Sequence, residues 1–223
     1  LCFTPPDVPV EVGPLPAAET GHVTFGCFNK AEKVNVRVIA CWSRILHAVP
    51  GSRLYLKSKA LGDAAVAEHY RKRFAEHGIG AERLILEGES GFREYLESYH
   101  RVDIALDPYP YNGGTTTVQS LWMGVPTLTL QGDRYVAHMG ESILHAVGMP
   151  EWIASDEEDY VAKAAALASD LPALAAIRAG LRERLLASPI CDAPGFARKL
   201  EEAFRSMWRQ WCKRLENQRH DEI

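Results

Sequence analysis

The chain has 223 residues, enough for one large domain or two small ones, and its hydrophobic content of 47% is sufficient to form a core. A formal net charge of −4 argues against a broad nucleic-acid-binding surface, although a local basic patch stays open. Five cysteines without regular spacing indicate reduced thiols in a cytoplasmic protein, and the sequence shows no signal peptide and no apolar run of membrane-spanning length.

The first 20 residues are rich in proline. Prolines at positions 5, 6, 9, 14 and 16 predict an extended linker that lies outside the core. The chain opens with Leu-Cys-Phe-Thr-Pro-Pro, which is not typical of a natural N-terminus. We therefore expect it to be a fragment of a longer protein.

From residue 21 onwards, β-type segments alternate with helical ones. The apolar and alternating patterns predict strands at residues 22–28, 53–57, 83–87, 102–106, 127–130 and 152–154. Apolar residues at helical spacing predict helices at residues 35–48, 62–77, 92–99, 115–123, 139–147, 157–168, 171–186 and 195–215. This alternation predicts a Rossmann-like α/β fold, which is a doubly wound parallel sheet with helices on both faces.

One stretch, from residue 103 to residue 124, combines a strand, a turn and a helix start. The turn ends in the run Gly113, Gly114, Thr115, Thr116 and Thr117. The first N–H groups of a helix lack internal partners, and the helix dipole is positive there. Glycines let a phosphate approach the backbone, and threonine hydroxyls add donors. The pattern predicts a phosphate site, with an ordinary threonine N-cap as the alternative.

Polar side chains also follow two other predicted strands, at residues 29–33 and 57–59. Ligands of parallel sheets bind outside the carboxyl ends of the strands, where all three polar clusters are expected to meet. Lys33 can supply a positive charge to a phosphate. A single lysine is more typical of a solvated surface, but the three clusters together favour the phosphate site.

Several separated stretches follow the pattern of a known family. They are Phe-Gly-Cys-Phe-Asn-Lys-Ala-Glu-Lys-Val at 25–34, Trp42, Ile45-Leu46 and Val-Pro-Gly-Ser at 49–52, Leu-Asp-Pro-Tyr-Pro-Tyr-Asn-Gly-Gly-Thr-Thr-Thr at 106–117, Leu-Trp-Met-Gly-Val-Pro at 121–126, Ser-Pro-Ile at 188–190 and Met207-Trp208. In this order, from about residue 20 to 212, they resemble the nucleocytoplasmic O-GlcNAc transferase family. The chain is also similar to the plant SPINDLY branch, whose members transfer fucose, and to bacterial cytoplasmic glucosyltransferases of the same superfamily.

The resemblance implies the C-terminal, nucleotide-sugar-binding lobe of a GT-B glycosyltransferase. It divides the chain into an interlobe linker at residues 1–20, a Rossmann-like domain that binds the nucleotide sugar at residues 21–194, and a C-terminal crossing helix and tail at residues 195–223. The implied partners are a nucleotide sugar, a protein acceptor, and the N-terminal catalytic lobe and tetratricopeptide repeats of the same full-length protein. Neither nucleic acid nor a membrane is expected as a partner.

The resemblance also implies roles for single residues. Lys33 stands where the family has its catalytically important lysine beside the diphosphate, and Lys30 occupies a nearby position that is Gln in the animal enzymes. Thr115 and Thr116 match the family's paired threonines. The predicted nucleotide-sugar-binding set is Asn29, Lys30, Lys33, Gly113, Gly114, Thr115, Thr116, Thr117 and Gln119.

The sequence departs from the animal pattern at two of these positions. Gly114 replaces a histidine near the diphosphate, and Gln119 replaces an acidic residue that usually holds the ribose. The base-binding segment, residues 87–95 here, does not match the animal residues, so the base stays unassigned. UDP-GlcNAc is the favoured donor, and the alternatives are GDP-fucose or a non-catalytic lobe that binds a nucleotide or a partner protein.

The chemistry of the leaving group bears on cofactors. Transfer from a nucleotide diphosphate sugar releases a dianion whose developing charge must be stabilised. The sequence has no Asp-x-Asp motif of the kind that holds a divalent metal. Lys33 and the helix start are expected to replace the metal, so no cofactor is predicted. Any catalytic base is expected on the missing lobe, and His138 is interpreted as a surface or helix-start histidine.

The predicted helix at residues 195–215 carries an apolar stripe. Its members are Phe196, Leu200, Phe204, Met207, Trp208 and Trp211. We expect Trp208 and Trp211 to pack on the missing lobe, as the last helix of GT-B enzymes tends to cross back. For the first half of the helix, an ordinary core position is an equal alternative.

Overall fold

The computed structural model describes residues 2–220, with side chains up to residue 214. Its centre is a six-stranded sheet in the order β3-β2-β1-β4-β5-β6. All neighbouring strands pair in parallel. The strands are β1 (Thr24–Cys27), β2 (Arg53–Lys57), β3 (Leu84–Glu87), β4 (Ile104–Leu106), β5 (Thr127–Leu130) and β6 (Ile153–Ala154). The chain winds outwards from β1 in both directions, which confirms the doubly wound prediction.

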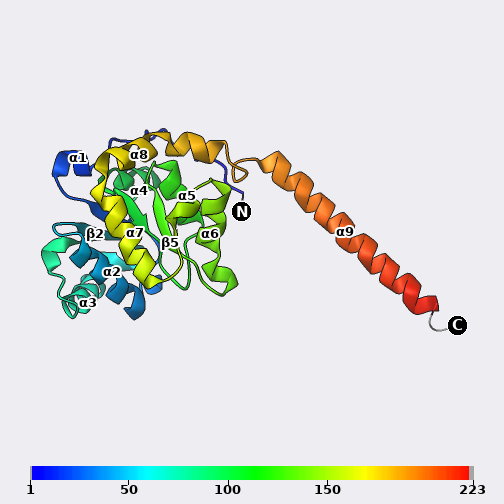
Figure 1. Ribbon diagram of the computed structural model, residues 1–223, viewed down its shortest axis with the longest axis horizontal. Coiled ribbons are helices and arrows are strands. Elements are labelled where there is room, and N and C mark those ends of the chain that lie inside the picture. Colours follow the sequence, from blue (N-terminus) through cyan, green and yellow to red (C-terminus); the bar gives the residue numbers. More distant parts are fainter. Residues whose placement is uncertain (1, 221–223) are drawn as a thin grey trace.

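Helices cover both faces of this sheet (Figure 1). They are α2 (Val36–Ala48), α3 (Ala64–Ala75), α4 (Phe92–Glu97), α5 (Thr115–Trp122), α6 (Met139–Ala146), α7 (Glu157–Ser169) and α8 (Leu171–Leu186). Helix α2 packs against α3 and α7, and α5 packs against α6 and α8. Each predicted helix of residues 35–186 is present, with its bounds shifted by a few residues at most.

Helix α2 illustrates how the sequence builds these layers. The side chain of Asn35 accepts hydrogen bonds from the N–H groups of Arg37 and Val38, which fixes the start of the helix. The apolar positions expected at helical spacing then face the sheet, and Trp42 and Ile45 are fully buried. Burial of such a face supplies most of the stability of a helix of this length.

The N-terminal segment belongs partly to the core, so the expectation that it lies outside the core is wrong. Val10, Leu15 and Ala17 are buried, and a short helix, α1 (Ala17–Thr20), follows the last proline. Asp103 accepts the Ala17 N–H at 2.8 Å, and the buried Arg178 donates to the Gly13 carbonyl at 2.8 Å. The segment is therefore fastened to β4 and α8, and its role as an interlobe connector stays a prediction.

Helix α9 (Ala193–His220) extends away from the body of the domain (Figure 1). Its apolar stripe is exposed, with exposed fractions between 41% at Leu200 and 62% at Trp208. The core alternative for the first half of the helix is therefore wrong. The rings of Trp208 and Trp211 stack on each other with centroids 5.1 Å apart. Because neither tryptophan is buried, the prediction that this helix crosses to another lobe stays open.

The helices do not have the combination of length and apolarity that a membrane span requires, within the part of the chain that the structure describes. Within residues 2–220, no single helix is both long and apolar enough to cross a bilayer. Helices α7 and α8 meet the length and composition criteria only as a pair that bends by 94°.

Candidate functional site

A cleft of about 810 Å³ opens beyond the carboxyl ends of β1 and β4. Its walls come from the turn after β1, the loop after β4, the start of α5 and the segment that precedes α6. Six of the predicted site residues line it, namely Asn29, Lys30, Lys33, Gly114, Thr115 and Thr116. The two polar clusters that follow β1 and β4 therefore meet at one edge of the sheet, as predicted.

Lys33 connects the two walls of this cleft. It ends a 3-10 turn, η1 (Ala31–Lys33), and its Nζ donates to the Asn112 carbonyl at 2.8 Å and to Asn29 Oδ1 at 3.2 Å. Partial burial lowers the pKa of Lys33, and the nearby carboxylate of Asp107 opposes that shift. Lys33 is half-buried, and its ammonium is held by the backbone of the loop that leads into the threonines of α5.

The loop after β4 is held by a buried carboxylate that the sequence did not single out. Asp107 is 1% exposed; its Oδ1 accepts the Gly113 N–H at 2.6 Å and its Oδ2 accepts the Thr129 hydroxyl at 2.8 Å. Burial raises the pKa of Asp107 to about 7. A Cβ on Gly113 would lie 2.5 Å from Thr117 Oγ1, so the loop closes only around a glycine.

The three threonines of helix α5 take different positions. Thr115 and Thr116 line the cleft, whereas Thr117 is 3% exposed and points below the loop towards Gly113. The N-cap is Gly114, and no side chain caps the helix. The alternative of an ordinary threonine N-cap is therefore wrong. The first N–H groups of α5 stand at the cleft without a side-chain cap, which is the arrangement that anions bind.

Gln119 lies in a second hollow, of about 460 Å³, that adjoins the cleft and shares its Phe28, Asn29 and Lys30 walls. Its amide oxygen accepts a hydrogen bond from the Tyr95 hydroxyl at 2.9 Å. The segment predicted to bind the base lines the same hollow through residues 88–90, 92 and 95. So does the polar cluster of residues 57–59, which therefore does not reach the main cleft.

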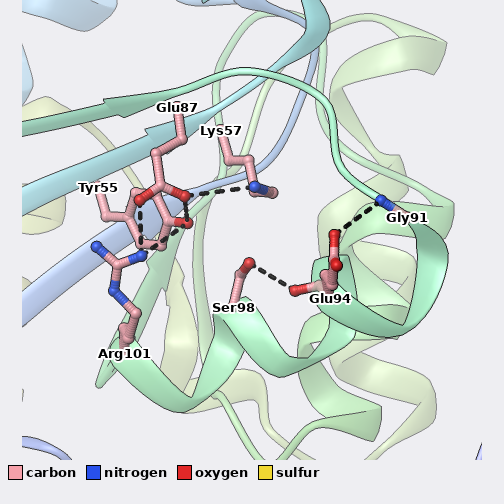
Figure 2. Close-up of polar contacts among 7 residues, drawn as sticks. All are labelled: Tyr55, Lys57, Glu87, Gly91, Glu94, Ser98 and Arg101. Carbon is pink, nitrogen blue, oxygen red and sulfur yellow. Dashed lines mark hydrogen bonds and ion pairs between the residues drawn. The ribbon is translucent and has the colours of Figure 1, made fainter. Parts of the chain in front are cut away.

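A polar network on β2 and β3 lies beside this second hollow, and its member Lys57 also lines the hollow (Figure 2). The Glu87 carboxylate accepts hydrogen bonds from the Tyr55 hydroxyl and from Arg101 Nη1, the latter at 2.7 Å. The ammonium of Lys57, whose side chain is 7% exposed, lies 3.4 Å from the same carboxylate. Burial opposes ionisation of Glu87, but these hydrogen bonds outweigh it and lower its pKa. The network fixes the two strand ends relative to η4 (Ser98–Arg101).

The remaining candidates for chemistry lie away from the cleft wall. His138 is the N-cap residue of α6, and its Nδ1 lies 2.8 Å from Glu141 Oε2, in agreement with the helix-start interpretation. Among the side chains that the structure describes, up to residue 214, no group of three or more His, Cys, Asp and Glu is arranged to hold a metal ion. Metal independence of the reaction stays a prediction that a chelator can test.

The sequence of the chain matches a known protein family. The model of glycosyl transferase family 41 matches residues 15–200. The chain belongs to this family. It is 39% identical over 214 residues to the probable UDP-N-acetylglucosamine–peptide N-acetylglucosaminyltransferase SPINDLY of Arabidopsis thaliana, covering 96% of this chain and 23% of that protein. It is 28% identical over 190 residues to the UDP-N-acetylglucosamine–peptide N-acetylglucosaminyltransferase of Caenorhabditis elegans, covering 85% of this chain and 16% of that protein.

Solved structures agree with this assignment. A mutant of the Thermobaculum terrenum O-GlcNAc transferase superposes with a TM-score of 0.86 at 34% identity, covering 95% of this chain and 40% of that one. Anabaena Alr3699/HepE, at 12% identity and a TM-score of 0.57 over 85% of this chain and 51% of that one, shares the fold alone. The fold is that of the C-terminal lobe of a GT-B glycosyltransferase. The chain spans about a quarter of the length of its plant relatives.

Proposed function

We propose that the chain is the donor-binding lobe of a glycosyltransferase, with UDP-GlcNAc as the favoured donor and protein Ser/Thr hydroxyls as acceptors. One observation carries the proposal: Lys33 and the uncapped start of α5 face the same cleft, from segments that follow two different strands. A lysine and a helix N-terminus together form a site for a diphosphate. The names of the plant and animal relatives, which specify UDP-N-acetylglucosamine and peptide acceptors, support the choice of donor and acceptor.

The proposed reaction breaks the bond between the anomeric carbon and the diphosphate and forms a bond from that carbon to the acceptor oxygen. Negative charge grows on the diphosphate as the bond breaks. Lys33, the N–H groups at the start of α5 and the hydroxyls of Thr115 and Thr116 would stabilise that charge without a metal or other cofactor. The proton of the acceptor hydroxyl would pass to a base on the preceding lobe, which the full-length protein is expected to supply.

The decisive experiment measures release of nucleotide diphosphate by the full-length enzyme. Lys33→Ala is expected to lower kcat more than it raises KM, because the leaving-group charge exists only near the transition state. Lys72→Ala, an exposed lysine on α3, is the matched control for loss of a surface charge. EDTA is expected to leave the rate unchanged. Wild-type turnover by Lys33→Ala, or loss of activity in EDTA, would defeat the proposal.

GDP-fucose is the second donor to test, because Gly114 stands where the animal enzymes have histidine and because identity to the SPINDLY proteins is higher, 39% against 28% for the Caenorhabditis elegans relative. A thermal-shift panel of UDP, GDP and their sugar conjugates separates the two donors. Stabilisation by the uridine compounds alone supports the favoured donor, and stabilisation by the guanosine compounds alone supports the second. Binding without turnover in the full-length enzyme would instead indicate a non-catalytic lobe.

A further inference from the structure

The ammonium of Lys33 has three partners within the chain. Two of its three N–H groups donate to the Asn112 carbonyl and to Asn29 Oδ1. The aromatic ring of Tyr111 lies over the same nitrogen, with its centroid 4.1 Å away, which is the geometry of a cation–π contact. A phosphate oxygen that binds Lys33 must therefore replace one of these three partners.

The three partners differ in how easily they can leave. Asn29 and Asn112 are 7% and 1% exposed. Asn112 is fastened further, because its Nδ2 donates to the Pro108 carbonyl at 3.0 Å and its backbone N–H donates to the Val136 carbonyl at 3.2 Å. Tyr111 is 56% exposed, and within the described residues its hydroxyl forms no hydrogen bond. The Tyr111 ring is the partner that can be exchanged without breaking the loop.

We propose that Tyr111 is a displaceable cap on Lys33, a positioning residue whose ring occupies the face of the ammonium that a diphosphate takes. The contact of the ring with the ammonium holds the lysine in place beside the start of α5. An entering diphosphate turns the ring away and replaces a weak cation–π contact by a charge-assisted hydrogen bond. The identity of the anion rests on the proposed function, whereas the contact between ring and lysine does not.

Competition between the ring and the anion for Lys33 predicts the direction in which a substitution of Tyr111 changes the affinity for pyrophosphate. Tyr111→Leu removes the attraction of the ring for the ammonium but leaves an apolar side chain on the exposed loop. We expect it to bind inorganic pyrophosphate about 2- to 5-fold more tightly than the wild-type chain in calorimetric titrations, the factor that corresponds to an exposed cation–π contact. Tyr111→Phe keeps the ring and loses only the hydroxyl, so its affinity should equal that of the wild type.

The outcomes separate this inference from the proposed function. Wild-type binding of pyrophosphate together with equal affinities for the Leu and Phe variants would overturn the cap and leave the diphosphate site standing. Weaker binding by Tyr111→Leu would also overturn the cap, because the ring would then assist the anion. Failure of the wild-type chain to bind pyrophosphate at all would overturn both proposals.

A second measurement follows the ring itself. In protein labelled with fluorotyrosine, the ¹⁹F resonance that disappears in Tyr111→Phe belongs to Tyr111, and pyrophosphate should shift it. The resonance of Tyr55, which is buried, lies outside the cleft lining and donates its hydroxyl to Glu87, serves as the internal control. In Lys33→Met the ring has no ammonium to cover, so pyrophosphate should no longer shift the Tyr111 resonance. A Tyr111 resonance that stays in place while pyrophosphate binds to the wild-type chain would overturn the inference.

Discussion

Asp107 accepts the Gly113 N–H at 2.6 Å, so the first residue after β4 fixes the residue that precedes the N-cap of α5. This single contact closes the loop on which Tyr111 and Asn112 are carried. The carboxylate lies buried beneath the loop, and Lys33 lies close enough to influence its ionisation. The geometry of the cleft therefore depends on a group that never touches the cleft surface.

We predict that Asp107 makes the stability of the chain depend on pH. Burial raises its pKa to about 7 from the ordinary value of 3.8, so the folded protein retains a proton that the unfolded chain has lost. This carboxyl contributes stability that is fully present below about pH 4 and is lost as the pH rises through 7. The free energy of unfolding of the wild type, relative to that of Asp107→Asn, should therefore fall by up to about 4 kcal/mol over this range.

Urea unfolding of both proteins at a series of pH values measures this difference. Asp133→Asn, at an exposed side chain, controls for a general effect of replacing a carboxylate by an amide. If the difference between the wild type and Asp107→Asn is constant from pH 4 to pH 8, Asp107 does not titrate as described.

Gly113 is predicted to be intolerant of any side chain. A Cβ there would lie 2.5 Å from Thr117 Oγ1 and 3.0 Å from Asp107 Oδ1. Gly113→Ala should lower the free energy of unfolding by about 1–3 kcal/mol, the usual cost of overpacking a filled site. Gly114→Ala is the matched control, because its Cβ would meet only Met139 Cγ at 3.7 Å and should change stability little.

A double mutant shows whether the clash is the cause. Thr117→Ala removes the atom that the new methyl group would strike, so Gly113→Ala should cost less in that background. The coupling energy between the two positions is expected to exceed about 0.5 kcal/mol. Additive effects would mean that the cost of Gly113→Ala has another origin.

Thr117 itself leads to a separate prediction. Its hydroxyl is buried and has no hydrogen-bond partner among the described side chains and backbone groups. A buried hydroxyl without a partner costs free energy, so Thr117→Val should raise the free energy of unfolding by about 1 kcal/mol. Thermal unfolding measures the change, with Thr115→Val at an exposed position as the control. A clear loss of stability in Thr117→Val would indicate that the hydroxyl is satisfied, for example by a water molecule.

The sequence predicted the elements of this fold better than their side-chain contacts. Strands β2 and β5 have the predicted bounds, because turn residues flank short apolar runs at both places. The meeting of Lys33 with the start of α5 also followed from the pattern, since both come after strands of one parallel sheet. The position of Thr117 did not, because a helix turns each successive residue by about 100° and the phase of α5 is set by the packing of Val118 and Leu121.

Contacts between distant residues account for the other differences. The proline-rich start is typical of a linker, but two distant residues fasten it to the domain. Asp103 binds a group 86 residues before it in the chain, and Arg178 binds a group 165 residues before it. Asp107 follows an apolar run that predicts a strand, and its partner Thr129 lies on the neighbouring strand β5. Neither partnership leaves a local pattern in the sequence.

Helix α9 is predicted to have its natural partner in the preceding lobe of the full-length protein. Trp208 and Trp211 are 62% and 52% exposed here, although tryptophan is rarely left on a surface without a partner. The double variant Trp208→Ser with Trp211→Ser should change the unfolding free energy of this chain by less than about 0.5 kcal/mol, as is usual for surface positions. In the full-length protein the same variant should be destabilised by several kcal/mol, since burying one large aromatic side chain contributes about 1.5–3 kcal/mol.

Parallel denaturant titrations of the chain and of the full-length protein measure both values. Arg209→Ser, at an exposed polar position between the two tryptophans, is the control in each protein. Equal effects of the double variant in the two proteins would show that the tryptophans have no partner outside this chain.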